Sequence, residues 1–229
     1  MTRALATTVL AVLAVLGLAA SAPGSQVRAD DLFDEFDVLC LAPEGDEDLT
    51  WAMAVHKGYS RLEPSDFEDL RVLAFARELK GMSRTVEGVE YRVLTARGSM
   101  APAGSDYRGF YQLCWVSAGP ADYAEVRRLT HSRVGLPSFT QGHSRVMAWV
   151  ETPEGREPLT RNQIERRQLG PLMVERDVRM VTMGQHSGRQ VMLGYMRRRD
   201  RDQRDVDFLE RHGLPVGPDR PLEAPRSPG

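Results

Sequence analysis

The stretch FYQLCWVS, residues 110–117, points to a fold built around a sheet. It is rich in aromatic and β-branched residues and has the length of one buried strand, so we predict that it lies centrally in a sheet. It also carries Cys114, and a central strand is where a buried half-cystine is expected. The flanking sequence should therefore supply the neighbouring strands, the helices that cover them and the partner of this cysteine.

The N-terminal segment has the pattern of a secretory signal peptide. A single early arginine precedes an apolar run at 9–20, which has the length typical of such signals, roughly 7–15 residues. Small residues at the required spacing end at Ala22 and at Ala29, so cleavage is expected after one of them. We therefore predict a periplasmic or secreted protein, with a signal peptide and a short linker over residues 1–29. An uncleaved anchor is the alternative, because the run extended to 4–22 approaches the roughly 20 residues that cross a bilayer.

The chain has two cysteines, Cys40 and Cys114, so only one intramolecular pairing is possible. An oxidising compartment favours a disulfide between an even number of thiols, and we predict this bridge. Two separate buried thiols are the alternative. The chain lacks a C-x-x-C motif, which argues against a thioredoxin-like redox activity. Two cysteines also cannot form a zinc site without help from histidines.

Residues 30–48 combine nine acidic residues, no basic residue and an apolar stripe. The helical spacing of the stripe predicts a short helix that docks by its apolar edge and delivers Cys40 to the core. We interpret the carboxylates as a solvated acidic face. A calcium site is the alternative, although the loop 44–48 lacks the ligand spacing of an EF-hand. The apolar residues of the stripe are Leu32, Phe33, Phe36 and Leu39.

Two further helices are predicted before the central strand. The first covers residues 46–57, buries three apolar residues at positions i, i+3 and i+6, and ends at Gly58. The second opens at the capping box 65–68 and continues as an amphipathic stretch to Gly81. The core-facing residues expected in the first of these helices are Leu49, Ala52 and Val55.

Five strands are predicted in all, of which the last two form a hairpin. Residues 97–108 are expected to be a loop. A helix should begin at the Gly119-Pro120 pair and end before Gly135, and a short one should follow the capping box 160–163. The expected strands are residues 86–96, with a turn near Gly88, then 110–117, 146–150, 177–183 and 189–195.

These elements predict one α+β domain over residues 30–196. It would have an antiparallel or mixed sheet of about five strands, three to five helices and one disulfide. From residue 197 the sequence changes to dense charge and repeated proline. We interpret residues 197–229 as a mobile tail with no more than a helical turn at 206–209. The three arginines at 197–199 are interpreted as solvated charge that neighbouring aspartates neutralise.

Composition and motifs argue against several function classes. The net charge of −2 is not that of a nucleic-acid binder. Phosphate-binding glycine loops are absent from the sequence, so no nucleotide cofactor is expected. The five histidines show no metal-ligand spacing, so no metal site is expected either, and no catalytic residue can be assigned. These histidines are His56, His131, His143, His186 and His212.

Three tryptophans, Trp51, Trp115 and Trp149, fall on three different predicted elements. If they converge, they form an aromatic-walled pocket for a small apolar or sugar ligand. The alternative is that each belongs to the hydrophobic core. The sequence leaves both interpretations open.

The sequence therefore predicts an exported domain with a binding or structural role in the cell envelope and without enzymatic activity. Its partner would be a protein or a small ligand. One alternative is an exported hydrolase whose Ser/His/carboxylate site assembles from distant residues. Another is an envelope assembly factor that keeps its N-terminal segment as an anchor, and only in this case is membrane contact expected.

Overall fold

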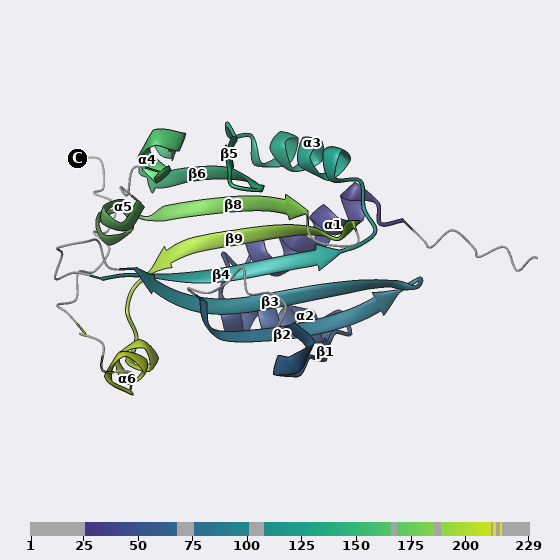
Figure 1. Cartoon of the computed structure of the whole chain (residues 1–229), viewed down its shortest axis with the longest axis horizontal. Helices are drawn as coiled ribbons and strands as arrows, with labels where there is room; N and C mark the ends of the chain where they lie inside the picture. The colour runs from purple at the N-terminus through teal and green to yellow at the C-terminus, as the bar shows by residue number, and fades with distance from the viewer. Residues whose placement is uncertain are drawn as a thin grey trace, which may run out of the picture.

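A computed structural model of the chain describes residues 26–67, 76–100, 108–165, 169–185, 189–211, 213 and 216. Its centre is one antiparallel sheet in the order β1-β2-β3-β4-β9-β8-β6-β5, and β7 also pairs with β6 (Figure 1). The strands are β1 (Ser60–Arg61), β2 (Ala76–Val86), β3 (Val89–Met100), β4 (Gly109–Ala118), β5 (Phe139–Gln141), β6 (Ser144–Thr152), β7 (Gly155–Pro158), β8 (Val178–Gln185) and β9 (Val191–Arg199).

The described helices are short and precede, interrupt or follow the strands. The α-helices are α1 (Ala29–Phe36), α2 (Glu47–His56), α3 (Tyr123–Val134), α4 (Arg161–Glu165), α5 (Leu169–Glu175) and α6 (Gln203–Arg211). A π-helical turn η1 (Asp37–Leu41) continues α1, and a 3-10 turn η2 (Pro64–Phe67) precedes β2.

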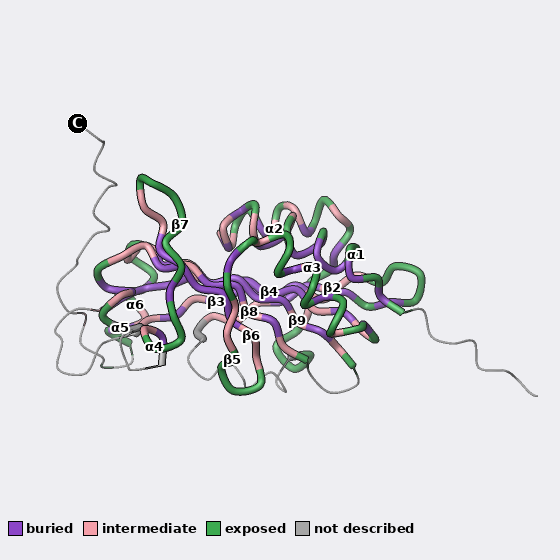
Figure 2. Tube along the Cα trace, turned by 90° about the horizontal axis from the view of Figure 1, so that it is seen from above, coloured by how far each residue is buried: buried purple, intermediate pink, exposed green. Residues whose placement is uncertain are grey.

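The sheet separates two hydrophobic cores because side chains alternate along its strands. In β4, Cys114 and Val116 face the core that contains the buried residues of α1, α2 and α3. Leu113 and Trp115 face the other core, to which α5 contributes Met173. Figure 2 shows α1 and α2 gathered on one side of the sheet. We call the side covered by α1, α2 and α3 the helical face, and the other side the opposite face.

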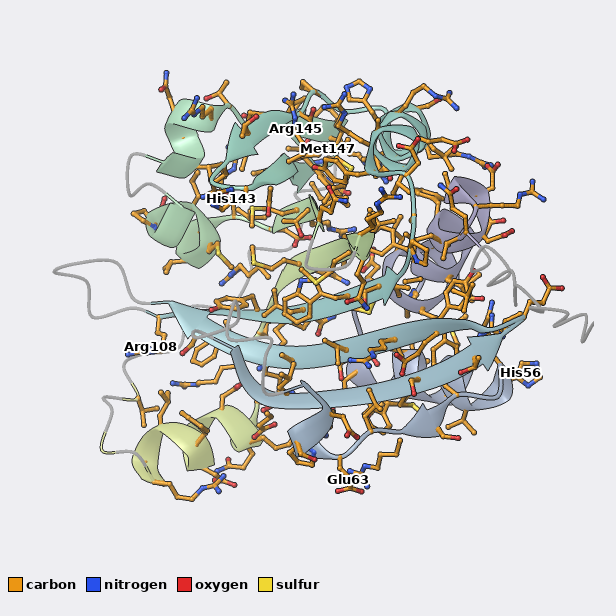
Figure 3. The ribbon with its side chains drawn as sticks, turned by 45° about the vertical axis from the view of Figure 1, so that its right-hand side comes forward. His56, Glu63, Arg108, His143, Arg145 and Met147 are labelled. Carbon is orange, nitrogen blue, oxygen red and sulfur yellow. A yellow bond between two sulfur atoms is a disulfide. The ribbon has the colours of Figure 1, made fainter. Side chains whose placement is uncertain are left out.

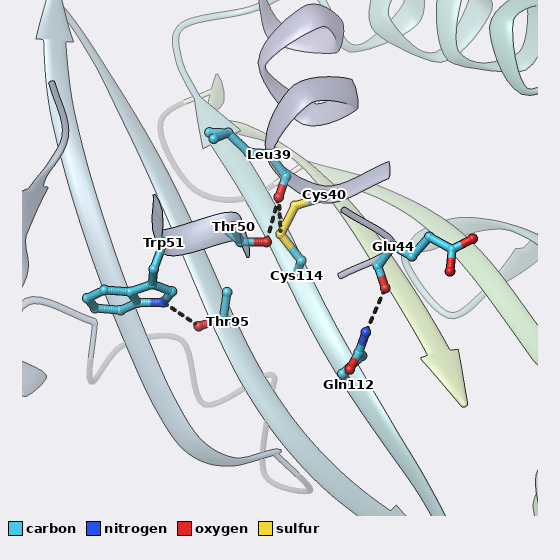
Figure 4. Close-up of a disulfide and its surroundings, with 8 residues drawn as sticks. All are labelled: Leu39, Cys40, Glu44, Thr50, Trp51, Thr95, Gln112 and Cys114. Carbon is cyan, nitrogen blue, oxygen red and sulfur yellow. Dashed lines mark hydrogen bonds between the residues drawn. A yellow bond between two sulfur atoms is a disulfide. The ribbon is translucent and has the colours of Figure 1, made fainter. Parts of the chain in front are cut away.

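The predicted disulfide joins η1 to the central strand. Cys40 and Cys114 are both fully buried, and their Cα atoms lie 5.4 Å apart. Beside the bridge, Gln112 Nε2 of β4 donates a hydrogen bond of 2.8 Å to the carbonyl oxygen of Glu44 (Figure 4). The segment between α1 and α2 is thus fastened to the middle of the sheet by a covalent bond and a hydrogen bond.

The prediction of about five strands and three to five helices is wrong, because the described residues form a sheet of nine strands and six α-helices. The helix expected over residues 65–81 is replaced at its two ends by η2 and β2. In β2, Leu79 packs into the core of the opposite face, whereas Lys80 pairs with Thr95 on the helical face, which is the alternation of a strand. The other apolar residues of that expected helix, Leu70, Leu73 and Phe75, lie outside the described residues.

The remaining extra strands lack the alternation of apolar residues on which the prediction depended. β1, β5 and β7 are two to four residues long, and most of their side chains are exposed. Short edge strands of this kind have no buried face and therefore no apolar periodicity. The expected strand 86–96 is present as β3, and the expected turn near Gly88 joins it to β2. β3 then continues to Met100, into the expected loop.

The helix predicted over residues 46–57 is present as α2, but it buries a different side from the one expected. Leu49 and Val55 are 56% and 61% exposed. The side that faces the sheet carries Thr50, Trp51 and Ala54. Thr50 Oγ1 donates a hydrogen bond of 2.7 Å to the carbonyl oxygen of Leu39. Trp51 Nε1 donates a hydrogen bond of 2.9 Å to Thr95 Oγ1. Polar side chains that bring their own hydrogen-bond partners can occupy the buried side of a helix, and an apolar pattern does not reveal them.

The helix expected to begin at Gly119-Pro120 begins instead at Tyr123, because Asp122 accepts hydrogen bonds from the first turn of α3. Other local signals are confirmed. Gly135 ends α3 with a φ of 73°, in the left-handed region that favours glycine. Thr160 and Gln163 form the expected capping contact at 2.8 Å. The hairpin is present as β8 and β9, although residues 186–188 of its turn lie outside the described residues.

Secondary structure extends past residue 196, where the tail was expected to begin. β9 runs to Arg199, whose guanidinium donates to both carboxylate oxygens of Asp205 in α6, at 2.6 and 2.7 Å. Arg97 of β3 donates a hydrogen bond of 2.6 Å to the carboxylate of Asp202. Burial raises the pKa of Asp202, but the hydrogen bond and charge of Arg97 outweigh burial and lower this pKa below its ordinary value. This contact therefore stabilises the fold at neutral pH and is lost as the pH falls through the lowered pKa.

Replacing Cys40 or Cys114 by Ala should lower the free energy of unfolding by about 2–5 kcal/mol, because the unfolded chain regains the freedom of a long loop. The two variants should lose the same amount in urea denaturation without reductant. The wild-type protein should lose that amount when dithiothreitol is added. Labelling of both thiols in the native, untreated protein would contradict the bridge.

Replacing Leu209 by Ala should lower the free energy of unfolding by about 2–5 kcal/mol, because the side chain of Leu209 is fully buried in α6. Its neighbour Glu210 is exposed, and Glu210→Ala is the matched control, expected within about 0.5 kcal/mol of wild type. Chemical denaturation measures both. Equal stability of the two variants would mean that α6 does not pack against the domain.

Candidate functional site

Three arginines lie in one line across the helical face. Direct strand pairing places Trp149 beside Arg179, Arg179 beside Arg197, Arg197 beside Gln112, and Gln112 beside Arg97. Directly paired residues of antiparallel strands point to the same side of a sheet. We call Arg179, Arg197 and Arg97 the arginine row. Gln112, which lies in the same line, donates a hydrogen bond to the carbonyl oxygen of Glu44. The segment between α1 and α2 therefore packs over the arginine row.

Carboxylates from the segment between α1 and α2, and from the first turn of α2, neutralise the arginine row. Glu44 accepts a hydrogen bond of 2.7 Å from Arg179 and also pairs with Arg197. Glu47 pairs with Lys80 and lies 3.8 Å from Arg97. The acidic stretch is thus not the wholly solvated face that the sequence indicated. The missed signal is that so many carboxylates without a local cation require basic partners elsewhere in the chain.

A cavity of about 370 Å³ lies on the helical face beside Arg179. Its walls come from α1, η1, the end of α3 and the strands β6, β7, β8 and β9. We call it the helical-face cavity. Its aromatic side chains are Phe33, Trp149 and Tyr195, and its basic side chains are Arg133, Arg156 and Arg179.

The aromatic wall of the cavity is almost completely buried. Trp149 and Tyr195 have ring centroids 6.4 Å apart, and Trp149 Nε1 donates a hydrogen bond of 2.8 Å to Glu151 Oε1. Tyr195 pairs across the sheet with Cys114, so the disulfide lies beside this wall, on the same face of the sheet. Burial raises the pKa of Tyr195 to about 12, against the opposing effect of Arg179, and its phenol is neutral at physiological pH.

Arg179 is the most enclosed cation of the cavity, with its side chain 14% exposed. Its guanidinium lies 2.7 Å from Glu44, 3.1 Å from Asp177 and 3.4 Å from Glu151. Burial alone would lower the pKa of Arg179, but Tyr195, Asp177 and Glu151 outweigh burial and raise this pKa above its ordinary value. The base of the cavity therefore holds a permanently charged, well-compensated guanidinium.

The other two arginines lie at the mouth and are more open. The side chains of Arg133 and Arg156 are 54% and 51% exposed. Arg133 lies over the ring of Phe33 at 5.9 Å, and Arg156 lies over the ring of Trp149 at 5.2 Å. Each is a cation–π contact between a mouth arginine and the aromatic wall.

The structure does not bring the three tryptophans together. Trp51 lies on α2 with its indole N–H bound to Thr95, on the helical face, whereas Trp115 is buried in the core of the opposite face. Trp149 is buried on the helical face and lines the cavity. Of the predicted pocket residues, Trp149 is thus the one that contributes to the candidate site.

The described histidines are exposed and scattered. Figure 3 shows His56 and His143 on separate parts of the molecule, at the end of α2 and in the turn between β5 and β6. His131 lies on the exposed side of α3. His186 and His212 lie outside the described residues. Among the residues that the structure describes, no group of three or more His, Cys, Asp and Glu side chains could hold a metal ion.

A second cavity, of about 390 Å³, surrounds the start of α1 and the β2–β3 turn. Its buried carboxylate, Glu35, is compensated by Arg84 and by Lys57 at 3.0 Å, and it accepts a hydrogen bond from the Tyr59 hydroxyl at 3.1 Å. Its lining includes residues 26–28, the first that the structure describes. We favour the helical-face cavity because its walls are built entirely from the folded domain.

No family model matches the sequence, and no curated protein and no solved structure is significantly similar to it. Within the described part of the chain, no helix has the length and apolar character needed to cross a bilayer. The function must therefore be argued from the site itself.

Replacing Arg179 by Met should lower the free energy of unfolding by about 1–3 kcal/mol at pH 7, because Glu44, Asp177 and Glu151 would keep their charge without its cation. Chemical denaturation at pH 7 measures this loss. Arg127→Met, on the exposed side of α3, is the control and should stay within about 0.5 kcal/mol of wild type. An equal loss in the two variants would contradict the argument.

Proposed function

We propose that this chain is an exported binding domain that holds a small ligand in the helical-face cavity, without chemical conversion of the ligand. The observation that carries the proposal is the cavity itself. Its volume of about 370 Å³ falls in the range of small-molecule sites, roughly 300–1,000 Å³. An aromatic wall with a few charged groups is the usual composition of such sites.

The construction of the cavity supports a binding role. In its aromatic wall, Trp149 and Tyr195 are strand residues held by cross-strand pairing, and the Cys40–Cys114 bridge lies beside Tyr195. The arginine row and its carboxylates fix the base of the cavity. A site preorganised in this way loses little conformational entropy when a ligand binds.

Two observations support export. The N-terminal sequence has the pattern of a cleavable signal, and an intramolecular disulfide is compatible with an oxidising compartment. Both agree with a location in the periplasm or outside the cell. A role in the cell envelope remains part of the same proposal.

A binding role is favoured over the alternative of a hydrolase. Catalysis by a serine nucleophile needs a base within hydrogen-bond distance of it. The described histidines, His56, His131 and His143, are exposed, and none of them lines either cavity. The charged groups of the helical-face cavity are instead tied to one another, which suits the recognition of a ligand.

A fragment screen by crystal soaking tests the proposal on the purified exported protein. Small aromatic and aliphatic fragments should gather in the helical-face cavity, between Phe33 and Trp149, and should raise the melting temperature in solution. Val134→Trp should abolish both effects, because Val134 lines the cavity and the larger side chain fills it. Val55→Trp, on the exposed side of α2, is the matched control and should bind as wild type does. A screen with no fragment in this cavity would overturn the proposal.

A further inference from the structure

The three arginines of the helical-face cavity differ in how completely carboxylates satisfy them. The guanidinium of Arg179 has carboxylate oxygens at 2.7, 3.1 and 3.4 Å, and no further anion is needed there. Arg133 has its nearest carboxylate, Asp30, at 4.0 Å, and Arg156 has Glu151 at 3.5 Å. Charge-assisted hydrogen bonds normally measure about 2.7–2.9 Å. Arg133 and Arg156 therefore keep N–H donors that can bind another anion, whereas Arg179 already binds carboxylates with its donors.

Contact with the aromatic wall leaves these donors available. Arg133 and Arg156 lie over the rings of Phe33 and Trp149, which are walls of the same cavity. A guanidinium over an aromatic ring keeps N–H donors that do not point at the ring, and these donors can meet an anion. Two such guanidinium groups on one cavity suit a carboxylate, which accepts charge-assisted N–H hydrogen bonds.

The remainder of the cavity suits an apolar body. Phe33, Trp149 and Tyr195 form the aromatic wall, and Leu41 and Val134 add aliphatic surface. The phenol of Tyr195 is neutral at physiological pH, so this wall carries no charge of its own. An aromatic or short aliphatic group would gain contact area here, in proportion to the apolar surface removed from water.

We propose that the helical-face cavity takes a small amphipathic carboxylate. Its apolar body lies against Phe33, Trp149 and Tyr195, and its carboxylate lies at the mouth between Arg133 and Arg156. This inference rests on the proposed binding function and specifies the chemical class of the ligand.

Two acidic residues also line the cavity and define the competing outcome. Glu44 is engaged by Arg179 and Arg197. Asp37 is exposed on η1 and would attract an amine to the same mouth. An amine analogue of the same shape is therefore the most informative comparison, because it reverses the sign of the group placed between the two arginines.

Isothermal titration with 3-phenylpropionate, 3-phenylpropanamide and 3-phenylpropylamine, on the full exported protein, tests the inference. The carboxylate should bind about tenfold more tightly than the amide, and the amine should bind most weakly. The double variant Arg133→Gln/Arg156→Gln should reduce the affinity for the carboxylate to that for the amide, and should leave the affinity for the amide unchanged. Arg128→Gln, on the exposed side of α3, is the charge-matched control and should have no effect.

The outcomes separate this inference from the proposed function. If the amide or the amine binds as tightly as the carboxylate, and Val134→Trp abolishes that binding, the cavity is a ligand site and the carboxylate assignment is wrong. An unchanged affinity for the carboxylate in the double variant leads to the same conclusion. If none of the three probes binds at millimolar concentration, both the inference and the proposed function are overturned.

Discussion

The bond between Cys40 and Cys114 holds the segment between α1 and α2 against the middle of the sheet. It brings Leu41 and Glu44 to the edge of the cavity, beside Tyr195, which pairs across the sheet with Cys114. The segment also buries Leu39 completely in the core. The covalent link adds to this apolar burial, because it removes conformational freedom from the unfolded chain.

Electrostatic compensation completes what the disulfide begins. Taking a carboxylate out of water is costly unless a cation and hydrogen bonds replace the lost hydration. Glu44 and Glu47 meet the arginine row, and Glu35 meets Arg84 and Lys57 at the other end of the segment. The acidic helical layer and the basic strands therefore depend on each other, and the cavity lies where this compensation changes from complete, at the base, to partial, at the mouth.

The sequence predicts what is local and apolar, and it misses what is polar and distant. The strand around Cys114, its bridge to Cys40 and the last hairpin follow from composition and periodicity. The short edge strands do not, because they have no buried face. The burial of Thr50 in α2 and the alignment of Arg179 with its row depend on partners far along the chain, which no local pattern encodes. The cavity was missed for the same reason, since its walls come from seven separate elements.

The two margins of the sheet are built differently from its middle. One margin ends in the two-residue β1, and the other ends in β5 and β7, of which β7 carries Arg156, Glu157 and Pro158. Brief strands with charge and proline offer few free backbone groups to an incoming chain. A broad open sheet would otherwise be a template for polymerisation. These short, polar margins therefore disfavour self-association through the edges of the sheet.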